Sequence, residues 1–175
     1  MRRLLLLRHA KTQGFEPGRD DRDRVLVERG RGDAARIGAY MASHSLKPDR
    51  VMVSPAARAQ ETWTCMAEAI RPAPAVATVE QIYDATTDDI LAAILGTPPD
   101  TRALLIVGHN PSLHETALLL IASGNIDARE ALREKLPTSG LVVIDFAFDD
   151  WSKLHPQGGR LDRFVTPRSL EASSR

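Results

Sequence analysis

Leu4-Leu5-Leu6-Leu7-Arg8-His9-Ala10-Lys11, near the start of the chain, joins an apolar run to a group of polar side chains. Four consecutive leucines between charged residues are typical of a strand that is buried on both faces, as in a parallel sheet. The run is too short for the apolar part of a signal peptide and far too short to span a bilayer, which takes about 20 residues. The stretch therefore predicts a buried strand that delivers Arg8 and His9 to its carboxyl end.

Apolar runs of strand length alternate with longer, helix-period segments along the rest of the chain. Strands are expected at residues 4–7, 50–53, 76–82, 103–107, 141–146 and 160–165, and helices at 28–43, 56–70, 86–95 and 111–123. This alternation predicts an α/β fold, a three-layer sandwich with a mostly parallel central sheet flanked by helices. Residues 1–166 are expected to form a single domain, and residues 167–175 a polar, disordered tail.

The composition argues against several classes of protein. Of the 175 residues, 43% are hydrophobic and 26% are charged, which is typical of a globular protein. The 23 basic and 23 acidic residues cancel, so neither a nucleic acid nor a membrane is expected as a partner. One cysteine, Cys65, cannot form an internal disulfide framework. A cytoplasmic protein is expected; its oligomeric state is open, with a monomer favoured.

Three of the expected strands are followed by residues that suit an anion. Arg8 and His9 follow the first strand, Ser54-Pro55 and then Arg58 follow the second, and Gly108-His109-Asn110-Pro111 follows the fourth. Because the carboxyl ends of parallel strands lie at one edge of a sheet, these side chains are expected to meet there. Ser54-Pro55 and Asn110-Pro111 each place an N-cap residue before a proline, which predicts two helix N-termini at the same edge.

Two histidines and two arginines around one anion suit the transfer of a phosphoryl group. A neutral imidazole at His9 can attack phosphorus, and Arg8 and Arg58 would disfavour the charged imidazolium form. The same arginines match phosphate oxygens two at a time and offset their charge during transfer. His109 can donate a hydrogen bond to one of these oxygens. Each residue alone also has a purely structural explanation, so the prediction depends on their convergence.

Three motifs resemble those of the histidine phosphatase superfamily, also called phosphoglycerate mutase-like. They are residues 4–11, residues 54–62 with Arg58, and residues 107–111 with His109; residues 26–30 are similar to the segment that opens the first helix of that family. The resemblance extends from residue 3 to about residue 146. It implies the phosphoglycerate mutase-like fold, a phosphohistidine intermediate on His9, phosphate binding by Arg8, Arg58 and His109, and no metal or other cofactor.

The short chain and the motif Arg8-His9-Ala10-Lys11 are most similar to the SixA-like phosphohistidine phosphatase branch of this family. Ala10 stands where the family usually has glycine. Members of the branch dephosphorylate histidine on signalling proteins, so the resemblance implies a phosphorylated protein as substrate. Two alternatives stay open: a phosphatase of a small phosphate ester, of sugar or nucleotide type, and a catalytically inactive phosphate-binding module.

Many members of the family place a carboxylic general acid after the third strand. Glu80 and Asp84 are the candidates here, although neither has a convincing spacing, and Glu80 could equally form a salt bridge. A missing acid would favour phosphohistidine as substrate, because imidazole leaves more easily than an alkoxide. Lys11 and Asn110 are further candidates for contact with the substrate, while Lys11 could equally be solvated.

Other polar groups are expected to lie outside the chemistry. The run Asp20-Asp21-Arg22-Asp23-Arg24 has mixed charge and is expected to be a solvated loop that could rim the pocket. His109, His114 and Glu115 do not have the spacing of a helical zinc pair, so no metal site is expected. His155 has no evident partner in the sequence.

Overall fold

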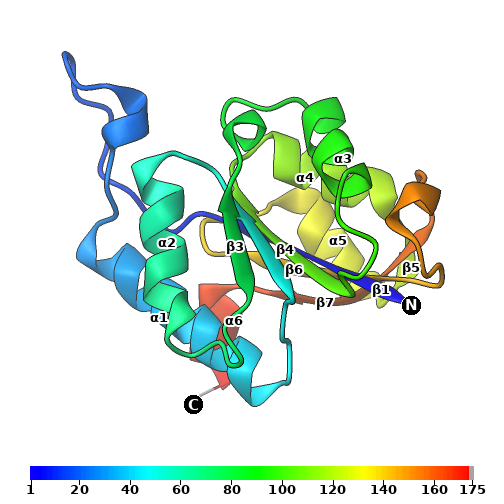
Figure 1. Cartoon of the computed structure of the whole chain (residues 1–175). Coiled ribbons are helices and arrows are strands. Elements are labelled where there is room, and N and C mark those ends of the chain that lie inside the picture. Colours follow the sequence, from blue (N-terminus) through cyan, green and yellow to red (C-terminus); the bar gives the residue numbers. More distant parts are fainter. Residues whose placement is uncertain (174–175) are drawn as a thin grey trace.

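One seven-stranded sheet runs through the computed structural model, which describes residues 1–173 (Figure 1). The strand order is β3-β2-β4-β1-β6-β7-β5. The strands are β1 Arg2–Arg8, β2 Arg50–Val53, β3 Ala75–Thr78, β4 Ala103–Gly108, β5 Ile121–Gly124, β6 Leu141–Phe146 and β7 Gly159–Val165. Every neighbouring pair is parallel except the two that involve β6, so the predicted α/β fold with a mostly parallel sheet is confirmed.

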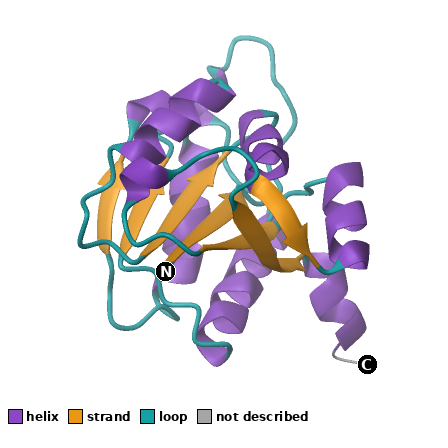
Figure 2. Ribbon diagram, turned by 90° about the vertical axis from the view of Figure 1, so that its right-hand side faces the viewer, coloured by secondary structure: helices purple, strands orange, loops and turns teal. Residues whose placement is uncertain are grey.

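Helices cover both faces of the sheet and make three layers (Figures 1 and 2). On one face lie α1, α2 and α6, and on the other lie α3, α4 and α5. Their bounds are α1 Glu28–Ser43, α2 Ala57–Ala67, α3 Thr87–Leu95, α4 Ser112–Leu120, α5 Ile126–Glu134 and α6 Pro167–Ser173. Within residues 1–173, no helix combines the length and the apolar character needed to cross a bilayer.

The four leucines of β1 supply both hydrophobic cores. Leu4 and Leu6 point into the core under α3, α4 and α5, whereas Leu5 and Leu7 point into the core under α1 and α2. All four side chains are fully buried. Complete burial of a leucine stabilises a fold by about 1.5–3 kcal/mol, so this strand is a large contributor to both layers. The prediction of a strand buried on both faces is confirmed.

The third predicted strand and the fourth predicted helix are both shorter in the structure than the sequence predicts. The strand predicted for residues 76–82 ends as β3 at Thr78, because β2 ends at Val53 and offers no partner beyond it; a 3₁₀ helix, Glu80–Ile82, follows and buries Ile82. The helix predicted for residues 111–123 ends at Leu120, because residues 121–124 pair with β7 as strand β5. Helix α5 was not predicted at all.

The prediction of a disordered tail is wrong for residues 167–173, which form α6. Thr166 and Ser169 close the first turn of this helix with reciprocal backbone-to-hydroxyl hydrogen bonds of 2.9 and 3.1 Å. Leu170 packs against the core under α1 and α2, and Glu171 lies 3.6 Å from Arg36 of α1. Docking on α1 thus orders a segment whose sequence alone is polar. The last part of that prediction, residues 174–175, lies outside the described residues.

Gly30 lets α1 approach the chain segment that follows His9. A Cβ atom at Gly30 would overlap the carbonyl oxygen of Lys11, while a Cβ at Gly32, on the exposed side of the same helix, would meet nothing within 4 Å. Lys11 is also tied to the start of α1 by a hydrogen bond of 3.1 Å from the Val27 amide to its carbonyl oxygen. The absence of a side chain at Gly30 therefore sets how closely the helix and this segment pack.

The two glycines allow a matched test of this contact. Gly30→Ala is expected to lower the free energy of unfolding by about 1–3 kcal/mol, because backbone atoms must move to admit the methyl group. Gly32→Ala is expected to raise it by up to about 1 kcal/mol, since alanine is the better helix former. Urea unfolding followed by circular dichroism measures both. Equal effects of the two substitutions would contradict the close approach at Gly30.

Candidate active site

The register of the sheet places His9 and His109 side by side. Arg8 of β1 pairs with Gly108 of β4. His9 directly follows Arg8, and His109 directly follows Gly108. Val53 of β2 pairs with Val107, which brings Ser54 to the same edge. The centres of the two imidazole rings are 5.2 Å apart. The predicted convergence of these strand ends is therefore present in the fold.

Hydrogen bonds from three elements hold the backbone around His9. The His9 amide donates to the Gly108 carbonyl (3.0 Å), and the Ala10 amide donates to Thr62 Oγ1 of α2 (2.9 Å). The Ser139 amide, in the turn before β6, donates to the carbonyls of both Arg8 (3.0 Å) and His9 (3.1 Å). The histidine therefore sits on a backbone fixed from β4, α2 and the turn before β6.

The backbone also fixes the tautomer of His9. Its Nδ1 lies 2.8 Å from the Ala10 carbonyl oxygen, which can only accept a hydrogen bond. Nδ1 must therefore carry the proton, and in the neutral ring Nε2 carries the lone pair. Among the described residues, Nε2 has no hydrogen-bond partner. A lone pair without a partner on a fixed ring is the arrangement that a nucleophile needs.

Both histidines are neutral near pH 7. Burial lowers the pKa of His9 to about 3; the Ala10 hydrogen bond opposes this, and His109, Arg58 and Arg8 lower the pKa further. Burial likewise lowers the pKa of His109 to about 4, with Arg58 as the second cause. The arginines act in the predicted direction, but removal from water is the larger effect.

His109 is held by Ser54. Its Nε2 lies 2.7 Å from Ser54 Oγ, which also accepts a hydrogen bond of 3.2 Å from the Ala56 amide. The Nδ1 atom of His109 is buried and has no partner among residues 1–173. When the Ser54 hydroxyl donates to Nε2, Nδ1 carries the proton and is free to donate to a bound oxyanion.

Neither Ser54 nor Asn110 caps its helix as predicted. The N-cap of α2 is Ala56 and that of α4 is Pro111, and neither helix has a side-chain cap hydrogen bond. Both side chains have partners elsewhere at this edge: Ser54 binds His109, and Asn110 Nδ2 donates to the Leu136 carbonyl (2.9 Å). The same carbonyl accepts a hydrogen bond of 3.1 Å from Nη1 of Arg8.

Arg58, in the first turn of α2, is buried and held by Asp21. Its Nη1 donates to the Asp21 carbonyl oxygen (2.8 Å) and its Nη2 lies 3.0 Å from the carboxylate Oδ2. The same Oδ2 accepts a hydrogen bond of 2.6 Å from the Tyr83 hydroxyl. This bond, with those from Arg24 and Arg58, holds the pKa of Asp21 well below its usual range. The Tyr83 ring in turn lies nearly perpendicular to the His109 ring, with the ring centres 5.6 Å apart.

The role of Asp21 in holding Arg58 does not follow from the sequence of its loop. The mixed charge of residues 20–24 predicts a solvated loop that could rim the pocket. In the structure, Asp21 is the acid of this loop that reaches Arg58, whereas Asp20 caps the 3₁₀ helix Asp21–Asp23 and Asp23 is exposed. The geometry of this turn determines which acid binds Arg58, and the local sequence does not indicate which of the three it is. Tyr83 and Ser139 were missed for a similar reason, because their partners lie far away in the chain.

Unpaired buried polar atoms gather at this edge of the sheet. Among the described residues, five buried side-chain nitrogen or oxygen atoms have no hydrogen-bond partner. Four of them belong to residues described above: Arg8 Nε, His109 Nδ1, Asn110 Oδ1 and Ser139 Oγ. A buried polar atom without a partner costs about 1–3 kcal/mol. Three of the four can donate, so an oxyanion with ordered water is a suitable occupant.

The two acids proposed from the sequence lie differently. Glu80 is exposed and forms an ion pair of 2.6 Å with Arg22, which is the alternative that the sequence left open. Asp84 is exposed and takes a left-handed backbone conformation (φ 51°). Within the described part of the chain, neither carboxylate forms a hydrogen bond or an ion pair with His9 or His109. Lys11 is exposed and lines a groove next to α1 and α5.

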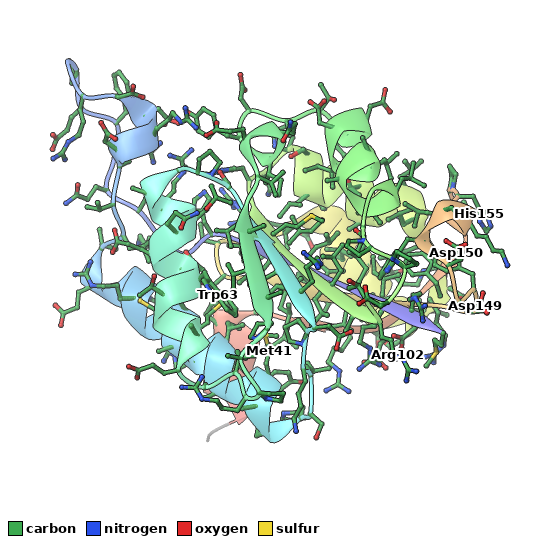
Figure 3. The ribbon with its side chains drawn as sticks, in the orientation of Figure 1. Met41, Trp63, Arg102, Asp149, Asp150 and His155 are labelled. Atoms are coloured by element: carbon green, nitrogen blue, oxygen red, sulfur yellow. The ribbon has the colours of Figure 1, made fainter. Side chains whose placement is uncertain are left out.

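The remaining histidines lie apart from this cluster. Figure 3 shows His155 with Asp149, Asp150 and Arg102 at the end of the molecule opposite the loop of residues 12–27, while Met41 and Trp63 lie on the α1 and α2 side. His114 is engaged with the Leu132 carbonyl at 2.5 Å. Residues 1–173 contain no group of three or more His, Cys, Asp or Glu side chains arranged to hold a metal ion.

Comparisons with known proteins agree on one family. A sequence profile for the "Histidine phosphatase superfamily (branch 1)" matches residues 4–82. An uncharacterized protein of Mycobacterium leprae is 34% identical over 166 residues, which cover 93% of this chain and 100% of that protein.

Solved structures extend the match to nearly the whole chain. A crystal structure from Agrobacterium tumefaciens, assigned as the phosphohistidine phosphatase SixA, is 30% identical, with a TM-score of 0.78 and coverage of 95% of this chain and 98% of that chain. A structure from Nakamurella multipartitia, assigned in the same way, is 26% identical, with a TM-score of 0.82 and coverage of 95% and 96%.

Thr62 offers a test of how the His9 backbone is held. Its hydroxyl donates to the Arg58 carbonyl (2.7 Å) and accepts from the Ala10 amide, and the side chain is fully buried. Thr62→Val is expected to lower the free energy of unfolding by about 1–3 kcal/mol, because the buried Ala10 amide loses its hydrogen-bond partner. Thr64→Val, on the exposed side of α2, is expected to change it by less than about 0.5 kcal/mol. Equal unfolding midpoints in urea for these two variants would contradict the role of Thr62.

The low pKa of His9 predicts how stability depends on pH. Between pH 7.5 and 5 an unfolded histidine, with its ordinary pKa near 6.5, takes up a proton, whereas folded His9, with a pKa of about 3, does not. The unfolded state therefore gains protons, and His9 should make the protein about 2 kcal/mol less stable at pH 5 than at pH 7.5. Urea unfolding at both pH values, in wild type and His9→Asn, measures this. The variant should lose about 2 kcal/mol less; parallel losses would show that His9 is not buried and neutral.

Proposed function

Because the chain belongs to the histidine phosphatase superfamily, in its SixA-like branch, and is therefore a phosphatase, we propose that His9 is its nucleophile and that phosphohistidine on a protein is its substrate. The lone pair on His9 Nε2 attacks phosphorus, and the bond between phosphorus and the leaving group breaks. Water then attacks the phosphorus of the phosphorylated His9, which releases inorganic phosphate and restores the free imidazole.

The Ala10 carbonyl supports both steps. Phosphorylation of Nε2 leaves the proton on Nδ1 and makes the ring cationic. The hydrogen bond of 2.8 Å from Nδ1 to the Ala10 oxygen stabilises that charge and keeps the ring in place for the attack by water. The low pKa of His9 favours the same cycle, since the free imidazole is unprotonated whenever substrate arrives.

Arg8, Arg58 and His109 are proposed to bind the phosphoryl oxygens. The single observation that carries this assignment is the set of buried, unpaired polar atoms around the two histidines, among them Arg8 Nε and His109 Nδ1. Loss of one such donor in a transition state typically costs about 2.7–4 kcal/mol. Arg58 donates two of its five N–H groups to Asp21, so three are available to bind the phosphate.

The surroundings of the site favour a phosphorus–nitrogen bond over an ester. Asp21 binds Arg58 of this cluster, and the low pKa of its carboxylate keeps it ionised and unable to donate a proton near pH 7. Glu80 is paired with Arg22 in solvent. An alkoxide leaving group needs a proton from a positioned acid, whereas the imidazole of phosphohistidine needs less help. A small phosphate ester is the alternative substrate, and a phosphate-binding module without activity is the third possibility.

Turnover of three substrates tests the proposal. Wild-type protein is expected to hydrolyse a histidine peptide phosphorylated with phosphoramidate, with kcat/KM at least about tenfold above those for p-nitrophenyl phosphate and glucose 6-phosphate. His9→Asn should retain less than about 1% of the activity, while His155→Asn, at the far end of the molecule, should retain it fully. A chelator should leave the wild-type rate unchanged.

Two results would overturn the proposal. Efficient hydrolysis of the esters without action on the phosphopeptide would assign a small-ester phosphatase instead. Binding of inorganic phosphate without turnover of any substrate would indicate an inactive binding module. Rapid-quench labelling adds a direct check, because wild-type protein should form an acid-labile, alkali-stable phosphoryl adduct that His9→Asn lacks.

A further inference from the structure

A groove of about 850 Å³ lies beside the histidine site, between α5, the end of β7 and the start of α6. Two of its lining residues adjoin the segments that carry and hold His9. Lys11, two residues after His9, lines it, and so does Thr138, which precedes the Ser139 amide that binds the carbonyls of Arg8 and His9. A polypeptide segment bound in this groove would therefore lie next to the backbone segments that carry and hold His9.

The groove carries positive charge on a chain that is neutral overall. Lys11, Lys135 and Arg168 are exposed on its rim, and within residues 1–173 none of the three has a carboxylate within 4 Å. A fourth cation, Arg29, lies 3.7 Å from Glu171. Of the acids that line the groove, Asp33 is bound by Arg36, which leaves Glu134 alone against the three unpaired cations.

The floor of the groove is apolar. Phe164 of β7 is half-buried and packs against the core under α3, α4 and α5. Pro137, half-buried, and Pro167, buried, also line the groove. An apolar floor with a cationic rim suits a polypeptide that carries carboxylates and one apolar side chain. The groove is also much larger than a phosphate group.

We propose that this groove binds the polypeptide next to the phosphorylated histidine, through carboxylates that face Lys11, Lys135 and Arg168. The inference rests on the proposed function, because it assumes that the phosphoryl group arrives on a protein. The groove then selects among phosphoproteins by charge, while the histidine site treats every phosphohistidine alike. Attraction between the rim and an acidic segment is screened by salt, so the selection should weaken as ionic strength rises.

Two matched peptides test this selection. Each has one histidine phosphorylated with phosphoramidate; one carries three glutamates on each side of it, and the other carries glutamines at the same positions. Phosphoimidazole serves as the small substrate, since it has the same bond and no polypeptide. Wild-type protein at low salt is expected to hydrolyse the glutamate peptide with kcat/KM about tenfold above that of the glutamine peptide.

Charge reversal locates the effect. Lys135→Glu with Arg168→Glu should abolish the advantage of the glutamate peptide and leave phosphoimidazole turnover unchanged. Lys47→Glu with Arg102→Glu changes the net charge equally at exposed positions away from the groove and should keep the advantage. Unchanged phosphoimidazole turnover also shows that each variant is folded.

The outcomes separate this inference from the function on which it rests. Equal turnover of the two peptides by wild type, or a preserved advantage in the groove variant, would overturn the docking role alone. Failure to hydrolyse phosphoimidazole and both peptides, with p-nitrophenyl phosphate still cleaved, would overturn the phosphohistidine substrate and the docking role together.

Discussion

The backbone of residues 8–10 is the constraint on which this structure depends. Hydrogen bonds hold it from three separate parts of the chain: the Ser139 amide, the Gly108 carbonyl and the Thr62 hydroxyl. Together they fix the position of His9. The helix that supplies Thr62 also supplies Arg58, one turn earlier, and their hydrogen bond couples the arginine to the histidine backbone. The Thr62 hydroxyl thus helps to hold both His9, the proposed nucleophile, and Arg58, a proposed phosphate-binding residue.

Burial at this edge acts on charge as well as on geometry. It lowers the pKa values of His9 and His109, and it leaves donors such as Arg8 Nε without a partner. A neutral protein thereby obtains a local site that favours an anion, at some cost to its own stability. Asp21 offsets part of the positive charge and orients Arg58 without using all of its donors.

The sequence predicted those features that depend on local pattern and on strand order. The four leucines of β1 indicated a strand buried on both faces, and residues that follow neighbouring parallel strands had to meet at one edge. Features that depend on distant partners were missed or wrong. The sequence predicts a helix cap at Ser54, but the partner of Ser54 is His109, 55 residues away. Helix α6 is ordered by docking on α1, and the geometry of one turn determines that Asp21, not its acidic neighbours, binds Arg58.

The central claim is that His9 Nε2 and the donors of Arg8, Arg58 and His109 surround one phosphoryl position. A crystal structure with bound vanadate, which resembles a phosphoryl group in transfer, tests it most directly. The account predicts a bond between vanadium and His9 Nε2, with the vanadate oxygens within hydrogen-bond distance of both arginines and of His109 Nδ1. Vanadate bound elsewhere, or bound at this edge without contact to His9 Nε2, would contradict it.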